Sequence, residues 1–506
     1  MDKPDVIIIG SGCGASPAAS NLASAGARVC VLERGTWWGS LQGKQPYPEG
    51  FLQFLKHIRG VGLSLPFIKK YIPLNRKAGL LEFYLVMNGY IIIIPCGVGG
   101  GSLVIGGFVD KPPRDIYDHY PDEITPEEME PHFESVAKVI QPSLAPVGTP
   151  YQRTVDAACG KIDGVDSIPQ MTSMWYGSGP NADEERINDY GCKQKNCAYQ
   201  ANCLTGCNRS SKNSTDITYL QQVLKNGGDI RELSEVTGIR KTDAGYTVDY
   251  TDLNDNIHRE ISAPKVIVSA GALNTVKILF ASRKNSDGLP LLSRKLGHRW
   301  GFNGDRVGMK LAKHTDINHT YGPCLFRYHE LKSDTYDFDF HQFACRISLL
   351  AWAPPPLRSY TKRIMPFLSL SREEPTGRIS PAGDVVTIEY AAQDGHRRAD
   401  RVQRLIAMES DALAKPLSEK ERRKRIEKIE SRKASKGIGS VHPTGGAAMA
   451  NTIEEGVVDH RGEVFNYPGL FVCDASIFPI GSCCGPHFFI LAHSDRISKL
   501  IIEREK

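Results

Sequence analysis

A glycine-rich turn near the N-terminus carries the clearest chemistry in the sequence. Gly10 and Gly12 permit a tight bend and a close approach of the backbone to a diphosphate, and Ala15 holds the third, close-packing position of the pattern. Glu33 follows Gly10 by 23 residues, where a carboxylate can accept hydrogen bonds from both hydroxyls of an adenosine ribose and repel a 2′-phosphate. The spacing predicts a site for FAD or NAD and does not distinguish between them.

Four cysteines form a second candidate site. Cys197, Cys203 and Cys207 have the spacing C-x5-C-x3-C, and Cys192 lies five residues upstream. Thiolates on an irregular loop can hold an iron–sulfur cluster or zinc. The alternative, which we favour, is that they are reduced or disulfide-bonded residues of a loop.

The hydrophobic pattern predicts the scaffold that would position the first site. An apolar run at residues 6–9, a small-residue helix ending near Gly26 and a second run at 28–32 give the strand, turn, helix and strand order of a dinucleotide site. Strand and helix patterns return at 265–281 and again from 469 onward. We therefore expect the two ends of the chain to share one domain.

Other segments predict further elements. Thr125 is typical of the cap of a helix that runs to about Val139. Short alternating runs between 310 and 410, such as 385–390, predict an antiparallel sheet. Residues 415–436 carry ten basic and four acidic side chains at helical spacing, which favours a solvated helix over an anionic docking surface.

Several segments resemble the glucose–methanol–choline (GMC) flavoprotein oxidoreductases, and their cholesterol oxidase branch most closely. They occur in the family's order along nearly the whole chain. The segments are CGVGGGSLVIGG at 96–107, SSKNSTDITYL at 210–220, VIVSAGALNTVKIL at 266–279, LPLLSRKLGHRWGFNGD at 289–305, PTGRISPAGDVVTIEY at 375–390, HPTGG at 442–446, FVCDAS at 471–476 and GSCCGPHFF at 481–489.

The resemblance implies an α/β fold with a Rossmann-like FAD-binding domain and a second, substrate domain built on an antiparallel β-sheet. We expect residues 1–309 and 438–506 to form the FAD-binding domain and 310–437 to form the substrate domain. Within the first, 37–95 reads as an excursion that covers the cofactor, and 150–214 as an irregular region that holds the cysteines.

The resemblance also implies FAD rather than NAD, and assigns cofactor contacts residue by residue. The glycine-rich segment at 96–107 contains no histidine, so we expect FAD to be bound without a covalent link. The implied contacts are Gly10, Gly12 and Ala15 at the diphosphate, Glu33 at the adenosine ribose, Val236 at adenine through its backbone, Gly99, Gly100 and Ser102 along the diphosphate and isoalloxazine, Asp474 at the ribityl or diphosphate part, and Pro486 before a helix whose N–H groups face the flavin pyrimidine.

Catalytic residues follow from the same resemblance, with two departures. His442 matches the family's catalytic histidine and can take the hydroxyl proton while hydride leaves the carbon. Gly485 stands where the family has Asn or His, and the nearest imidazole is His487. His487 reaches back, water fills the gap, or the chemistry has changed. Ile105 replaces a second polar residue near the flavin, so both departures make the reacting face less polar.

The main prediction is an FAD-dependent oxidoreductase that oxidises an apolar small-molecule alcohol and passes electrons to O2 or another acceptor. One alternative is a dehydrogenase with an iron–sulfur cluster on Cys197, Cys203 and Cys207 and a protein acceptor. Another is a GMC-fold flavoprotein whose chemistry is altered or lost because of Gly485.

Composition excludes several other classes. The chain has 506 residues, 41% hydrophobic and 24% charged, which is typical of a globular protein with a large core. A net charge of +5 is too small to indicate a nucleic-acid partner, and we expect none. The longest apolar run, 79–95, contains Glu82 and Asn88 and is too short for a transmembrane helix. Without an export signal we expect a cytoplasmic protein.

Overall fold

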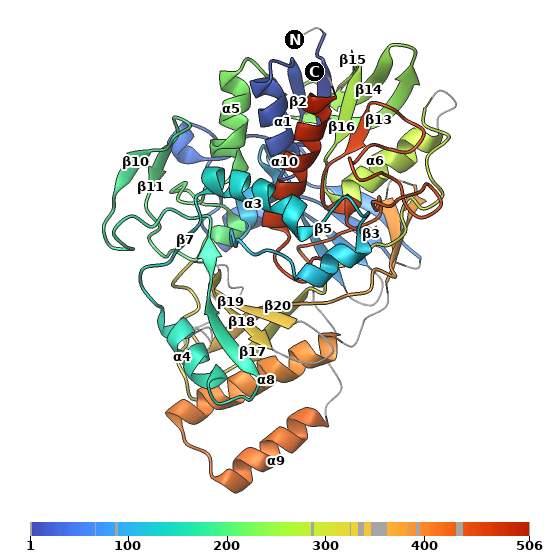
Figure 1. Ribbon diagram of the computed structural model, residues 1–506. Helices are drawn as coiled ribbons and strands as arrows, with labels where there is room; N and C mark the ends of the chain where they lie inside the picture. The colour runs from blue at the N-terminus through green and yellow to red at the C-terminus, as the bar shows by residue number, and fades with distance from the viewer. Residues whose placement is uncertain are drawn as a thin grey trace.

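The computed structural model describes residues 3–65, 67–86, 90–284, 288–323, 325–331, 338–345, 362–383, 385–390, 395–431 and 439–504. Figure 1 shows both chain ends at one end of the molecule, beside helices α1 (Ala15–Ser24) and α10 (His487–Glu503). Helices α8 (Gly395–Ala414) and α9 (Glu419–Glu430) lie at the opposite end.

A parallel sheet forms the centre of the nucleotide-binding part, because its strands are buried apolar runs joined by helices that cover them. Its central strands β1 and β2 are buried at every position. The order among the described residues is β12 (Asp229–Arg231), β2 (Val29–Leu32), β1 (Val6–Ile9), β16 (Lys265–Val268) and β23 (Leu470–Val472). The predicted strand–helix–strand unit is confirmed, and strands from both ends of the chain, β1 and β23, lie in this one sheet.

Helices and a second sheet cover this parallel sheet. Helix α1 contacts α10 and α5 (Tyr219–Lys225), and α10 also contacts α3 (Pro126–Ile140). Thr125 caps α3 by accepting a hydrogen bond from the Glu128 N–H, as predicted. The strands β13 (Ser234–Thr242), β14 (Gly245–Asp252) and β15 (Ile257–Ala263) form an antiparallel sheet, and α6 (Ala272–Lys284) packs on β13.

The segment predicted as a covering excursion forms a small sheet of its own. It contains α2 (Phe51–Lys56) and four strands in the order β4 (Lys69–Pro73), β3 (Ile58–Ser64), β5 (Leu81–Val86) and β6 (Ile91–Pro95). Buried ion pairs join it to the nucleotide-binding part: Arg34 meets Glu82 at 2.8 Å, and Arg59 meets Glu235 at 2.9 Å.

The predicted antiparallel sheet is present, with one strand from an unexpected place. Its order is β17 (Arg306–Leu311), β20 (Ile364–Ser371), β19 (Phe338–Phe343), β18 (Leu325–Leu331) and β8 (Val165–Pro169). Strand β8 lies in the region 150–214, which we expected to be irregular. That expectation is wrong there, because β8 pairs with β18 and α4 (Pro150–Cys159) packs on α8. The boundaries at 309/310 and 437/438 stay a prediction.

Residues 385–390 also lie elsewhere than expected. Strand β22 (Val385–Glu389) pairs with β21 (Arg378–Ala382) in a separate hairpin that contacts β3 and β4. The remaining described strands are β7 (Ser143–Leu144), which pairs with β9 (Met171–Thr172), and β10 (Glu185–Ile187), which pairs with β11 (Lys193–Lys195).

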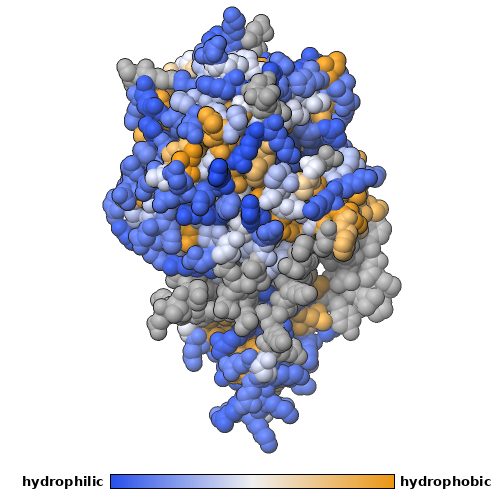
Figure 2. Space-filling model, turned by 90° about the vertical axis from the view of Figure 1, so that its right-hand side faces the viewer, coloured by the Kyte–Doolittle hydropathy of each residue, from blue (hydrophilic) through white to orange (hydrophobic). Residues whose placement is uncertain are grey.

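The basic stretch forms a solvated helix, as predicted. Ser418 and Glu421 make a capping box at the start of α9, and α9 has no buried residue along its described length. Figure 2 shows the tip of the molecule at this end as hydrophilic. Among the described helices, none combines the length and apolar character needed to cross a bilayer.

Candidate active site

A cavity of about 400 Å³ lies where the parallel sheet, the covering segment and the segment before α10 meet. Residues distant in sequence line it together. They include Gly10 and Gly12 of the first turn, Glu33, Ile93 to Pro95 of β6, Gly100, Gly101, Ile105, Phe108, Val236, Gly271, His442, Asp474, Gly485, Pro486 and His487.

Two glycine turns form a cradle of bare backbone. Gly10 has φ +95°, and a Cβ there would lie 2.2 Å from the Ser269 carbonyl oxygen. A Cβ on Gly100 would lie 2.6 Å from the Cα of Gly12, so the two turns touch. The start of α1 follows the first turn, and its unsatisfied N–H groups favour an anion. This cradle fits the diphosphate of FAD.

Three predicted contacts lie behind the cavity wall. Ala15 is fully buried as the first residue of α1, and the close approach expected of it occurs at Gly14, where a Cβ would lie 1.8 Å from the Cys473 carbonyl oxygen. The Ser102 hydroxyl donates to the Gly99 carbonyl at 2.7 Å. Gly99 and Ser102 therefore brace the 3-10 turn that presents Gly100.

Glu33 lines the cavity at the end of β2 and is held in place by backbone donors. Its Oε2 accepts hydrogen bonds from the Ser11 N–H at 3.1 Å and the Ser11 hydroxyl at 2.7 Å, and its Oε1 accepts from the Gly35 N–H at 2.8 Å. These bonds use three of the roughly four lone-pair sites of a carboxylate, so Oε1 can accept a further hydrogen bond. Val236 of β13 also lines the cavity, and the Ser234 N–H of the same strand donates to the Glu33 carbonyl at 2.7 Å, so the two predicted adenosine contacts lie close together.

Asp474 joins the end of β23 to the start of α6. Its Oδ2 accepts from the Gly271 N–H at 2.8 Å and the Thr275 hydroxyl at 2.5 Å, and its Oδ1 accepts from the Ser476 N–H at 2.8 Å. Burial raises the pKa of this carboxyl, and these donors oppose that shift. Asp474 lines the cavity as predicted.

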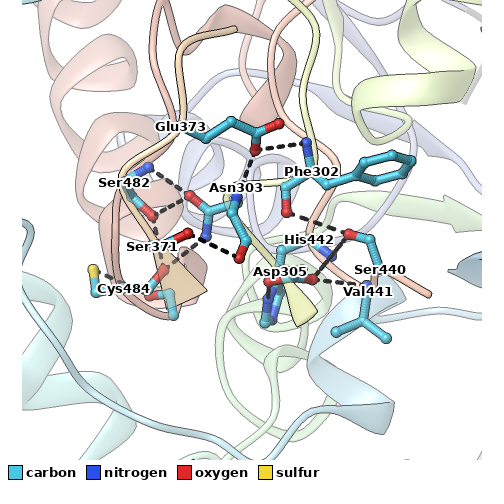
Figure 3. A network of polar contacts seen from close by, with 12 residues as sticks. Phe302, Asn303, Asp305, Ser371, Glu373, Ser440, Val441, His442, Ser482 and Cys484 are labelled. Atoms are coloured by element: carbon cyan, nitrogen blue, oxygen red, sulfur yellow. Dashed lines mark hydrogen bonds and ion pairs between the residues drawn. The ribbon is translucent and has the colours of Figure 1, made fainter. Parts of the chain in front are cut away.

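His442 is oriented by an aspartate that the sequence analysis did not single out. The His442 Nδ1 lies 2.9 Å from Asp305 Oδ1, and the imidazole is 11% exposed. Asp305 Oδ2 accepts from the Ser440 hydroxyl at 2.9 Å and the His442 N–H at 3.1 Å (Figure 3). A carboxylate partner at Nδ1 favours the tautomer with the proton there, which leaves Nε2 as an acceptor.

Residues 302–305 form a turn that makes hydrogen bonds to several parts of the site (Figure 3). Glu373, two residues after the end of β20, accepts hydrogen bonds from two N–H groups of this turn, at 3.0 and 2.5 Å, and burial raises its pKa to about 7. Asn303 accepts from the Ser482 N–H at 2.6 Å and donates to the Cys484 carbonyl at 2.8 Å. Since Asp305 holds His442, the turn links the histidine to the segment before α10.

Phe108 explains how the chain accommodates Gly485. A Cβ on Gly485 would lie 2.4 Å from Cδ2 and 2.7 Å from Cε2 of the Phe108 ring. The ring therefore occupies the space that a side chain at position 485 would need. Ile105 also lines the cavity, so the structure places both departures at its wall.

His487 lines the cavity as a neutral imidazole. Burial lowers its pKa to about 3, and the nearby charges of Lys212 and His442 act in the same direction. A hydrogen bond with the Phe108 backbone opposes this shift without reversing it. His487 can therefore donate or accept a hydrogen bond, but near neutral pH it does not carry a charge.

Lys212 is a buried cation behind the glycine-rich segment, and the sequence analysis also missed it. Its Nζ donates to the carbonyls of Leu103 at 2.9 Å, Ile105 at 2.8 Å and Cys203 at 3.3 Å. A lysine at 3% exposure requires such partners. Lys212 and Asp305 lie within the family-like segments at 210–220 and 289–305, and this position is the sequence signal that could have identified them.

The iron–sulfur alternative finds no support. Across the described residues, which include Cys192, Cys197, Cys203 and Cys207, no three His, Cys, Asp or Glu side chains gather closely enough to hold a metal ion. Cys197 and Cys203 instead belong to an apolar cluster with Phe108 and Met174. The cysteine spacing was a weak signal because it does not report where the side chains point.

The fold and the paired glycine turns are those of a dinucleotide-binding protein, and comparison identifies the family. The GMC oxidoreductase profiles match residues 19–316 and 367–494. The chain belongs to the GMC oxidoreductase family and is an enzyme of that class.

Its relatives are distant in sequence identity but match nearly the whole of this chain. A cholesterol oxidase of Mycobacterium tuberculosis (strain ATCC 25618 / H37Rv) is 22% identical over 98% of this chain and 91% of its own. A cholesterol oxidase of Acinetobacter baumannii is 24% identical over 98% and 94%, respectively. The long-chain-alcohol oxidase FAO4B of Arabidopsis thaliana is 23% identical over 99% of this chain and 67% of its own.

A solved structure has the same fold. The formate oxidase of Aspergillus oryzae RIB40, studied for the effect of the R554K mutation on FAD modification, superposes with a TM-score of 0.61. The superposition covers 100% of this chain and 98% of that one, at 13% identity.

Proposed function

We propose that this enzyme binds FAD and removes a hydride from the CH–OH carbon of an apolar alcohol, giving a ketone or an aldehyde. The observation that carries the proposal is that His442, held by Asp305, lines the same cavity as the two glycine turns. Relatives named as cholesterol oxidases and long-chain-alcohol oxidases support an apolar substrate. O2 or another acceptor would then reoxidise the cofactor.

The residues that would hold FAD follow from the cavity. Gly10, Gly12 and Gly100 would receive the diphosphate, and Glu33 would accept hydrogen bonds from the adenosine ribose. Asp474 would lie near the ribityl chain. The absence of a histidine from residues 96–107 supports non-covalent binding.

The start of α10 would favour negative charge at the flavin end. Its first backbone bond runs from the Ile490 N–H to the Pro486 carbonyl at 2.9 Å, so the N–H groups before Ile490 have no partner within the helix. Pro486, His487 and Ile490 line the cavity. When bound, FAD supplies the hydride acceptor, and charge that builds on its pyrimidine would be stabilised by these N–H groups and the helix dipole.

His442 would act as the catalytic base. With Nδ1–H donated to Asp305, its Nε2 accepts the substrate hydroxyl proton as the hydride leaves the carbon. Asp305 stabilises the imidazolium that results. His487 would supply a neutral hydrogen bond to the same hydroxyl, because its lowered pKa makes it a poor base.

The test is the reductive half-reaction of the His442→Ala holoenzyme, mixed anaerobically with alcohols and followed by flavin bleaching. We expect retained FAD and a rate about 10²–10⁴-fold below wild type. His298→Ala is the control, since His298 lies outside this cavity. If the variant retains FAD and its flavin bleaches at the wild-type rate, His442 is not the catalytic base.

A further inference from the structure

The Phe108 ring forms part of the cavity wall beside His442. Phe108 is 4% exposed, and its ring stands edge to face with the His442 imidazole, with centroids 6.5 Å apart and an interplanar angle of 87°. The three atoms nearest to a Cβ on Gly485 all belong to this ring. The ring therefore covers Gly485 and borders the proposed base.

The backbone fixes Phe108 on one side. The Gly107 carbonyl accepts from the Ser173 N–H at 2.6 Å, and the Val109 N–H donates to the Met171 carbonyl at 3.1 Å. Gly107 has φ +77°, a conformation that glycine adopts readily. These bonds tie residues 107–109 to the strand β9, so the direction of the Phe108 side chain is set by paired backbone.

A second contact fixes the ring from the five-stranded antiparallel sheet that contains β19. His341 of β19 is fully buried, and its ring centroid lies 4.5 Å from that of Phe108. Together with Gly485 on another side, this packing leaves the ring little freedom. The apolar face beside His442 is thus preorganised rather than formed when a substrate binds.

We propose that Phe108 determines substrate specificity at the reacting end of the cavity. This inference rests on the proposed alcohol oxidation. The Phe108 ring receives the hydrocarbon on the carbon adjacent to the reacting CH–OH. The site then accepts monohydroxy alcohols and discriminates against vicinal diols and polyols. Gly485 is the matching residue, because only a position without a side chain lets the ring sit there.

The physical reason is the cost of burying a polar group without a partner. The imidazoles of His442 and His487 can serve the reacting hydroxyl, whereas a second hydroxyl directed at Phe108 would lose its water and meet only ring carbons. Such a loss corresponds to a discrimination on the order of ten- to a hundredfold.

The first experiment measures anaerobic flavin reduction by 1-octanol and by 1,2-octanediol, which differ in one hydroxyl. Wild type should prefer 1-octanol by about tenfold or more. Phe108→Asn should reduce this ratio, and Phe108→Leu, the apolar control, should keep it. An equal shift in both variants, or no preference in wild type, would overturn the proposal. Failure of every alcohol to bleach the flavin would contradict the proposed function instead.

The second experiment is independent of turnover. Gly485→Asn should lower Tm and FAD retention because its side chain meets the Phe108 ring, and adding Phe108→Ala should recover part of the loss. Phe54→Ala, in a separate apolar cluster, is the control, and its effect on Tm should add to that of Gly485→Asn. If Phe108→Ala recovers no more of the Tm and FAD retention lost in Gly485→Asn than Phe54→Ala does, the Phe108 ring does not pack on Gly485.

Discussion

The Asp305 carboxylate lies 2.9 Å from His442 Nδ1 and also accepts the backbone N–H of His442. One side chain therefore fixes both the ring and the main chain of the proposed base. Asp305 is a positioning residue, since it touches His442 and not the reacting atoms. This relationship makes the direction of Nε2 a property of the fold.

Asp305→Asn should lower the rate of flavin reduction by about 10²–10⁴-fold, because an amide can donate to Nδ1 and stabilise the wrong tautomer. FAD content and the apparent KM for 1-octanol should stay close to wild type. Anaerobic stopped-flow measurement at saturating and limiting alcohol separates the two quantities. A rise in KM with an unchanged limiting rate would assign Asp305 to substrate binding and contradict the positioning role.

Gly100→Ala should abolish FAD binding, since its Cβ would lie 2.6 Å from the Gly12 Cα and separate the two turns. Gly43→Ala is a matched control: Gly43 also has positive φ, +69°, but no atom lies within 4 Å of its added Cβ. Both variants carry backbone strain, and only the first carries the clash. FAD content after purification gives the answer, and equal loss in the two variants would point to strain alone.

Lys212→Met should destabilise the enzyme by about 3 kcal/mol and weaken FAD binding, because three carbonyls behind the cavity lose a buried cationic donor. Lys225→Met, at an exposed position, should change neither quantity. Denaturant titration and FAD titration of the apoprotein measure the two effects. Unchanged FAD affinity in the Lys212 variant would show that the carbonyls hold their place without the lysine.

Glu373 should make stability depend on pH. Burial raises its pKa in the folded state to about 7 from 4.5, so the folded protein binds the proton more tightly than the unfolded chain. This contribution is fully present below pH 4.5 and is lost as the pH rises through about 7. Relative to wild type, Glu373→Gln should gain on the order of 2 °C in Tm between pH 5 and pH 8. A pH-independent difference would contradict the raised pKa.

The local parts of the fold were predictable from the sequence. The unit β1–α1–β2 and the Thr125 cap follow from apolar runs, glycines and a capping residue that act within a few positions. The pairing of β8 with β18 was not predictable, because strand partners far apart in sequence leave no periodic signal in either strand.

The candidate site was predictable to the same extent. His442, Glu33 and Asp474 could be named because each belongs to a recognisable motif, and the structure places all three at one cavity. The seat of Phe108 on Gly485 is a tertiary contact between distant segments, which neither residue type reveals alone. Likewise, the motif at 289–305 ends in Asp305, but nothing in its spacing indicates that it faces His442.

The most direct measurement of alcohol oxidation on FAD is the absorbance of the purified holoenzyme mixed anaerobically with a long-chain primary alcohol and, separately, with a sterol. We expect a flavin spectrum that bleaches with at least one of them, with aldehyde or ketone formed in equal amount to the flavin reduced. A protein without FAD after reconstitution, or a bound flavin that dithionite bleaches and no alcohol does, would contradict it.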